Sequence, residues 1–527
     1  MLCDKIDREI VIYIKSDKNL KERNCMLVAG NIAKKFAELF LELAKKTAEL
    51  AHQYIGNHQD IHGYYKYPIK TNTFSRSNPE FDELFEKVPF LTYDIPKYHM
   101  SDFPQDRILY SAIFDGYAKD LLDCTILKEF KLLLDYICSE PELKKLISEK
   151  DENLKYIVKN INVGIVGRYL FKTNATSDIP DDLDEQIRPF VAERLLRFLA
   201  KELRIDIFVP ICLATFEEDT IKLSDNVEII RMSEDIQMSR QQACSYEASN
   251  EDWVAACATH MIVLHNYHFD NTGDTSINSA TKNYNSYPLK EIDKVVAAIK
   301  VVTGYSIGYA QILSYPIEWI DGFCADLTPL YGAKAHFVNP KETEKFWMSL
   351  PVSMVSSDQS DILKTVYQNI LKCEEDANKS NLLFALNRFN RCMLRNDVDD
   401  MATDATIGIE ALLAGGTKEQ ITYTISNRIR VVFAYESNEL YNPLNCRAIM
   451  KKIYDYRSKI VHGGKLKEKD KFVEINGIKY DVPKIAVDFL RYSLLFMTEH
   501  QEFLDAKKFD EYIDGIIYSK IKKTGEE

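Results

Sequence analysis

The chain has 527 residues, a formal net charge of −13, 46% hydrophobic residues and 11% aromatic residues. This composition is typical of a globular protein and excludes a disordered or fibrous one. The eleven cysteines include no Cys-x-x-Cys pair, which argues against a zinc ribbon or a thioredoxin-like motif. The charged first residues and the lack of a long apolar run predict a cytoplasmic protein without a signal peptide or a membrane span.

Residues 1–203 are predicted to form a mainly helical region. Apolar residues recur at helical spacing through 31–54, 108–134 and 183–203. Residues 57–105 are rich in Tyr, Pro and Asn, which predicts irregular packed structure. We find no catalytic motif in this region.

Residues 204–345 are predicted to form an α+β domain with several short strands. Candidate strands lie in four runs, 204–216, 220–232, 253–269 and 304–319, and a helix is expected from Leu289 to Val302. The stretch from Asn339 to Ser360 has the composition of a linker.

Residues 361–510 are predicted to form a bundle of antiparallel helices, followed by a charged C-terminal tail at 511–527. The links between the helices are short, which favours antiparallel neighbours. The expected helices are 361–376, 380–394, 397–413, 419–436, 443–462 and 483–504. The predicted fold class is therefore α+β multidomain, and mostly α.

The most informative segment of the chain is YNPLNCRAIMKKIYDYRSKIVHGG. Asn442-Pro443 starts a helix well, and Gly463-Gly464 ends it. On a helical wheel Arg457 falls about 80° from Ile449, in the middle of the apolar arc. A guanidinium at such a position is costly unless something compensates its charge.

Two explanations of Arg457 remain open at this point. It can pair with a buried carboxylate, for which Glu410 in the preceding helix is the candidate, or it can meet a phosphate in a cleft. Arginine suits a phosphate because its planar fork donates hydrogen bonds in pairs. His462, five residues later, projects from the end of the helix, and histidine exchanges protons near neutral pH.

Basic residues gather around these two positions. Between Arg447 and Lys471 there are nine basic residues and three acidic ones. A compact basic patch on an acidic protein can hold a short polyanion, although for Lys465 to Lys471 alone a run of solvated lysines is the favoured explanation. The candidate RNA-binding residues are Lys452, Lys459, Lys465 and Lys467.

Histidines elsewhere do not suggest a metal site. His260, His265 and His268 lie close together in the sequence, but a regular strand would place His265 and His268 on opposite faces. His52, His58 and His62 have no characteristic ligand spacing either. We therefore expect no metal and no cofactor. The chain also has no Walker P-loop and no Gly-x-Gly-x-x-Gly motif.

The segment YDYRSKIVHGG resembles the Arg-x4-6-His signature of HEPN domains, in particular the Apea-like branch. Three other segments resemble helices of the same family. DVDDMATDATIGIEALLAGG is similar to its helix ending in acidic-Ala-Leu-Leu, ITYTISNRIRVVFA to its small-polar-Asn/Ala-Arg-Ile helix, and DFLRYSLLFM to its closing helix. The resemblance covers residues 380–505, roughly a quarter of the chain.

This resemblance implies a helical bundle, usually a homodimer, in which the two motifs meet across the interface. It also implies a metal-independent endoribonuclease, often an antiviral (abortive-infection) or toxin-like effector. Carried over to this chain, it makes Arg457 and His462 the catalytic residues, supported by Ser458, Glu410 and Tyr456. Ser458 departs from the Asn, Asp or His that is common after the arginine.

The implied partners are RNA, with tRNA as a candidate, a second copy of the chain, and a phage-derived trigger or an inhibitory protein. In the implied mechanism, His462 moves protons while a ribose 2′-hydroxyl attacks its own phosphodiester, and Arg457 stabilises the charge on the phosphorus. The product would carry a 2′,3′-cyclic phosphate. Two alternatives are a non-catalytic module that binds RNA or a nucleotide, and a structural helical adaptor.

Overall fold

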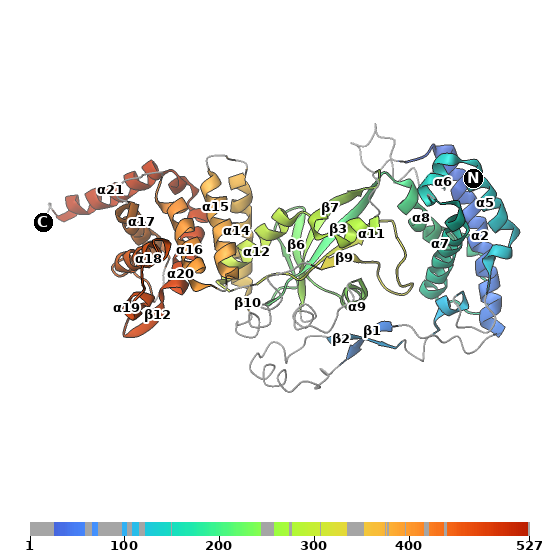
Figure 1. The fold of residues 1–527 in the computed structure, drawn as a ribbon, viewed down its shortest axis with the longest axis horizontal. Coiled ribbons are helices and arrows are strands. Elements are labelled where there is room, and N and C mark those ends of the chain that lie inside the picture. Colours follow the sequence, from blue (N-terminus) through green and yellow to red (C-terminus); the bar gives the residue numbers. More distant parts are fainter. Residues whose placement is uncertain are drawn as a thin grey trace.

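The computed structural model of the chain describes most of its residues, with gaps. The described residues are 26–57, 66–71, 97–102, 108–114, 122–148, 150–243, 258–272, 277–305, 307–334, 353–374, 376, 379–395, 397–415, 421–436 and 440–524. They form an elongated, mostly helical molecule with an antiparallel sheet at its middle (Figure 1). The predicted α+β, mostly α class is confirmed.

A helical unit lies at one end of the molecule (Figure 1). It packs around one hydrophobic core, to which Phe36, Phe40 and Leu43 contribute fully buried side chains at helical spacing. Its principal helices are α2 (Gly30–Asn57), α5 (Lys128–Ser139), α6 (Pro141–Ile147), α7 (Asp151–Lys172) and α8 (Leu183–Leu199). Two short 3-10 helices, η1 (Tyr110–Ile113) and η2 (Cys124–Ile126), precede α5.

The central sheet has six antiparallel strands in the order β5-β6-β7-β3-β8-β9. Its strands are β3 (Glu202–Pro210), β5 (Thr220–Lys222), β6 (Val227–Arg231), β7 (His260–Asp270), β8 (Gln311–Pro316) and β9 (Tyr331–Lys334). All four predicted strand runs overlap at least one of these strands. The helix expected from Leu289 to Val302 is α12 (Leu289–Thr303).

The two faces of the sheet pack against different elements. One face packs on α12 and continues into the core of the C-terminal bundle. The other face carries a smaller cluster that includes Phe208 and Met261 and is covered by α9 (Glu234–Ala243). The hairpin of β1 (Lys66–Thr71) and β2 (Lys97–Asp102) lies against α9, within the region predicted to be irregular.

The C-terminal bundle follows the predicted helices closely. It consists of α14 (Ser357–Glu374), α15 (Ser380–Leu394), α16 (Val398–Leu413), α17 (Ile421–Tyr435), α18 (Cys446–Val461) and α20 (Val482–Glu499). Of the expected linker at 339–360, residues 339–352 lie outside the described residues. Its described end forms β10 (Ser353–Val355), which pairs in parallel with β4 (Ala214–Phe216).

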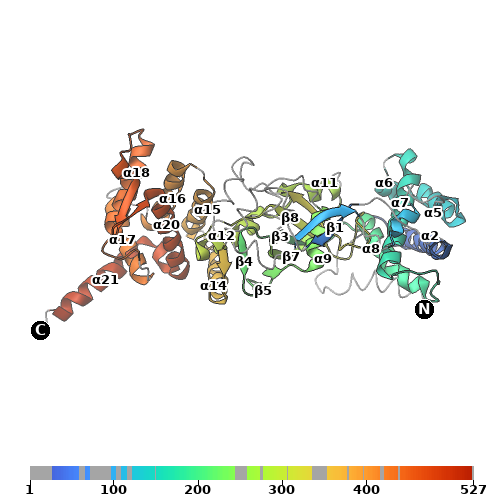
Figure 2. The ribbon, with the colours of Figure 1, turned by 90° about the horizontal axis from the view of Figure 1, so that it is seen from below.

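The segment expected as a charged tail is helical. Helix α21 (Ala506–Thr524) follows the short η5 (Gln501–Leu504) and projects beyond the bundle (Figure 2). Its first turns are held by Arg428 of α17, whose side chain is 2% exposed. The Arg428 guanidinium donates to both carboxylate oxygens of Asp510, at 3.0 and 2.7 Å, and to the carbonyl oxygens of Leu413 and Ala506.

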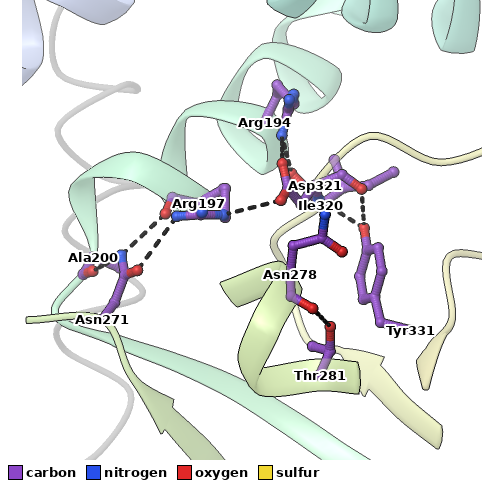
Figure 3. Close-up of polar contacts among 9 residues, drawn as sticks. All are labelled: Arg194, Arg197, Ala200, Asn271, Asn278, Thr281, Ile320, Asp321 and Tyr331. Carbon is purple, nitrogen blue, oxygen red and sulfur yellow. Dashed lines mark hydrogen bonds and ion pairs between the residues drawn. The ribbon is translucent and has the colours of Figure 1, made fainter. Parts of the chain in front are cut away.

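Polar contacts fix the helical unit against the sheet (Figure 3). Asp321, in the connection from β8 to β9, lies between Arg194 and Arg197 of α8, with its carboxylate 2.6 Å from Arg194 Nη1 and 3.4 Å from Arg197 Nε. The Tyr331 hydroxyl donates to the Asp321 carbonyl and accepts from its amide. The Asn271 side chain donates to the carbonyls of Arg197 and Ala200, where α8 ends.

Candidate active site on helix α18

Helix α18 begins at Cys446, three residues after the expected start at Pro443, and ends at the glycine pair as predicted. The Asn442 side chain accepts the amides of Leu444 and Asn445 just before the helix. His462 forms the C-cap, and Gly463 follows with φ +67°, a left-handed conformation that glycine adopts without strain. The candidate residues thus lie on a helix whose C-terminal end is well defined.

One face of α18 is buried in the bundle core. Cys446, Ile449, Met450, Ile453 and Tyr456 are buried, as the helical wheel predicts for Ile449, Ile453 and Tyr456. The opposite face is exposed and carries Arg447, Lys451, Asp455 and Ser458. Val461, placed near the apolar arc by the wheel, is 52% exposed because the helix ends there.

Arg457 lies at the border of the buried face and is half-buried. Its Nε is shielded from solvent and has no hydrogen-bond partner among the described residues. None of the ion pairs between described residues involves Arg457, although other arginines of the bundle have carboxylate partners. The guanidinium is therefore half-buried without a direct carboxylate partner in the described part of the chain, and burial of a charge in this way is unfavourable.

Glu410, the carboxylate considered as the partner of Arg457, is bonded to a different residue. Its Oε1 accepts a hydrogen bond from the Tyr454 hydroxyl at 2.7 Å. Tyr454 was not among the site residues predicted from the sequence. Its position three residues before Arg457 was a signal, because side chains at that spacing are neighbours on a helix.

His462 is exposed at the end of α18, and its amide donates to the Ser458 carbonyl at 3.1 Å. Five residues along a helix correspond to roughly 7.5 Å of rise and about 140° of rotation. The side chains of Arg457 and His462 therefore leave the helix on different sides. An active site that uses both side chains would therefore need further groups from elsewhere to be complete.

The supporting residues lie on different sides of α18. Ser458 is exposed next to Arg457. Tyr456 is 3% exposed, and its hydroxyl donates to Asp399 at 2.6 Å, which attaches α18 to the start of α16. Burial first, and then the Asp399 carboxylate, raise the pKa of Tyr456, so the phenol stays protonated and serves as a hydrogen-bond donor.

The candidate RNA-binding lysines differ in their surroundings. Lys465 and Lys467 are exposed, and Lys452 is half-exposed. Lys459 forms an ion pair with Asp470 at 2.8 Å. The hydrogen bond from Lys459 is the largest cause that lowers the pKa of Asp470. Because Asp470 also accepts the Lys467 amide at 2.9 Å, this pair holds the segment after His462 against α18.

A short helix and a hairpin follow His462 and were not expected from the sequence. They are α19 (Glu468–Lys471), β11 (Phe472–Ile475) and β12 (Ile478–Asp481). The signal for the hairpin is Asn476-Gly477, whose φ values of +53° and +79° are those of a tight hairpin turn. Lys479, on β12, is exposed, and it follows the candidate site residues closely along the sequence.

The expectation that His265 and His268 point to opposite faces of a strand was wrong. Strand β7 has one extra residue opposite β3, at Asn266, whose φ is +66°. The bulge returns His268 to the face that carries His265. His265 lies 2.9 Å from Asp206 and 3.2 Å from Glu228.

The N-terminal histidines lie elsewhere. His52 is a buried residue that is hydrogen-bonded to Tyr169 and to the Thr176 carbonyl. His58 and His62 lie outside the described residues.

The described residues offer neither a metal site nor a membrane-spanning helix. No group of three or more His, Cys, Asp or Glu side chains in this part of the chain could hold a metal ion. No helix among the described residues has the length and apolar character needed to cross a membrane. Comparison with family models, curated protein sequences and solved structures finds no match to this chain.

Proposed function

We propose that this protein is a metal-independent endoribonuclease of the HEPN type, with Arg457 and His462 as its catalytic residues. The observation that carries the proposal is the half-buried Arg457 guanidinium, which lacks a hydrogen-bonded or ionic partner among the described residues. A cation held in this way is suited to a phosphate ligand, and His462, five residues later on the same helix, is exposed and able to exchange protons. The resemblance of residues 380–505 to HEPN helices supports the same assignment.

In the proposed reaction, His462 takes the proton from a ribose 2′-hydroxyl or returns one to the leaving 5′-oxygen. The hydroxyl attacks the adjacent phosphorus, the bond to the 5′-oxygen breaks, and a 2′,3′-cyclic phosphate remains. Arg457 donates to the phosphoryl oxygens, on which negative charge increases. DNA lacks the 2′-hydroxyl and is not a substrate.

A homodimer completes the proposed site. Arg457 and His462 of one chain point about 140° apart around α18. A phosphate that contacts Arg457 is therefore reached more easily by His462 of a second chain than by His462 of the same chain. The exposed Arg447 and Lys451 of α18, together with Lys452, Lys465 and Lys467, extend the positive surface along which RNA would lie.

The test separates cleavage from binding. We would measure both with total tRNA for wild type, Arg457→Ala, His462→Ala and, as a matched control, the exposed His268→Ala. The nuclease proposal expects His462→Ala to bind RNA but not to cleave it, Arg457→Ala to lose both, and His268→Ala to resemble wild type. Binding without cleavage by every form, wild type included, would favour a non-catalytic module, consistent with Ser458 at the position after the arginine.

A further inference from the structure

Three side chains from two helices form a small polar group at the proposed site. Tyr454 and Arg457 are one turn apart on α18, and Glu410 comes from the last turn of α16, which packs against α18. All three are half-buried. The group therefore contains one carboxylate and two donors that can compete for it, the Tyr454 hydroxyl and the Arg457 guanidinium.

The structure assigns the carboxylate to the tyrosine. The Tyr454 hydroxyl donates to Glu410 Oε1 at 2.7 Å, while Arg457 Nε has no partner among the described residues. Burial and Glu410 together raise the pKa of Tyr454, and the positive charge of Arg457 opposes them. This opposition means that Arg457 lies within electrostatic reach of the hydroxyl that Glu410 accepts.

Of the two donors, Arg457 would form the stronger hydrogen bond with Glu410. A hydrogen bond between a carboxylate and a guanidinium is stronger than one between a carboxylate and a neutral phenol, because both groups are charged. Without the Tyr454 hydroxyl, Glu410 would lose the donor that it has in the structure, and Arg457, whose charge acts on that same hydroxyl, is a cation that could replace it. An arginine neutralised by Glu410 would bind a phosphate poorly, because the phosphate would first have to displace the carboxylate.

We propose that Tyr454 is a positioning residue that occupies Glu410 and thereby leaves the Arg457 guanidinium available for a phosphodiester. The proposal rests on the ribonuclease assignment for its functional meaning. The arrangement of the three side chains is a separate claim, which holds whether or not RNA is cut. Tyr454 acts through Glu410 and Arg457 and does not itself touch the RNA.

The arrangement is tested by the reactivity of Arg457 toward phenylglyoxal, which modifies free guanidinium groups. The rate at Arg457 would be measured by peptide mass spectrometry on the full-length chain for wild type, Tyr454→Phe, Glu410→Gln and the double variant. We expect Tyr454→Phe to react several-fold more slowly than wild type. Glu410→Gln and Tyr454→Phe/Glu410→Gln should both react at the wild-type rate, because a neutral amide does not capture the arginine.

Tyr456→Phe is the matched control. It also removes a short tyrosine–carboxylate hydrogen bond, to Asp399, from the same helix. A general loosening of α18 would change the reactivity of Arg457 in both phenylalanine variants, whereas the proposal expects a slower rate in Tyr454→Phe alone. Equal rates in Tyr454→Phe and wild type would overturn the proposal.

Cleavage of tRNA by the same variants connects the arrangement to function. We expect Tyr454→Phe to lose about 100-fold in activity, the lower end of the range found when one donor to a transition-state oxyanion is removed. Glu410→Gln in the Tyr454→Phe background should restore most of it, which a purely structural role of Tyr454 does not predict. If the reactivities follow the expected pattern but no form cleaves RNA, the ribonuclease assignment fails and the role of Tyr454 stands.

Discussion

His260 illustrates how a single buried residue links stability to pH. It is fully buried at the start of β7, next to the Phe216 ring, and its Nδ1 is 2.8 Å from the Thr259 hydroxyl. Burial, assisted by the charge of Arg231, lowers the pKa of His260 from 6.5 to about 4. The folded state therefore favours the neutral ring, and an unfolded chain takes up a proton at a higher pH.

The predicted consequence is a loss of stability in acid. The contribution of His260 to the free energy of unfolding is complete above pH 6.5. It decreases as the pH falls toward 4, by up to ~3 kcal/mol. We expect His260→Gln to show a smaller decrease in the free energy of unfolding between pH 7 and pH 4.5, measured by urea denaturation. The exposed His268→Gln should keep the wild-type pH dependence; a wild-type dependence in His260→Gln would contradict the prediction.

At the same scale, the sequence predicts the position of Arg457 but not its contacts. The helical wheel places it in the middle of the apolar arc of α18, whereas it is half-buried at the border of the buried face. The bond between Tyr454 and Glu410 depends on how two helices cross and on the rotamers at their contact. Neither can be derived from the spacing of residues within one helix, so the choice between a paired and an unpaired Arg457 remained open.

Among the elements, α21 depends most clearly on one buried side chain. Arg428 holds it through Asp510 and the Ala506 carbonyl. Asp510→Ala would leave the Arg428 guanidinium without a carboxylate, and we expect it to lower the local stability of α21 by about 1–3 kcal/mol. Hydrogen exchange of the amides from Ala506 to Asp514 should accelerate accordingly.

The control for this prediction is Lys507→Ala. The Lys507 side chain is 85% exposed, on the same helix, and its removal should leave the exchange rates unchanged. If Asp510→Ala exchanges as slowly as wild type, then apolar contacts such as those of Phe509, and not the arginine, hold the helix in place.

Elements with strong periodicity were predictable, and short ones were not. The six bundle helices and the strands β3, β6, β7 and β8 lie where the sequence patterns place them. Strands β11 and β12 have four residues each, too few for an alternating pattern to stand out, although Asn476-Gly477 marks their turn. The bulge at Asn266 was missed because it depends on pairing with β3, whose register a local pattern does not contain.

At the scale of the whole molecule, the three parts are joined in different ways. The sheet and the bundle share one hydrophobic core through α12. Arg491 of α20 also donates to the carbonyls of Val301 and Val302 at the end of α12. The helical unit has its own core, and it meets the sheet through the polar contacts around Asp321 (Figure 3) and through Leu196 and Ala200, at the end of α8, which pack against the shared core.

This difference predicts where the molecule is weakest. Asp321→Ala would leave Arg194 and Arg197 without their shared carboxylate, and both arginine side chains are mostly buried. We expect the helical unit to separate from the sheet more readily, which would raise the radius of gyration in small-angle X-ray scattering and speed proteolysis after α8. Asp225→Ala, which removes a 98% exposed carboxylate paired only with Lys222 among the described residues, should change neither. Identical scattering and proteolysis for Asp321→Ala and wild type would show that other contacts fix the junction.

The proposed reaction takes place at the end of α18, and the end groups of cleaved RNA test it most directly. We would incubate total tRNA in EDTA with wild type and with His462→Ala, and determine the 3′ ends of the fragments. The account predicts cleavage by wild type alone, with 2′,3′-cyclic phosphate ends. Equal cleavage by both proteins, or fragments with 3′-hydroxyl ends, would contradict the assignment of the reaction to His462.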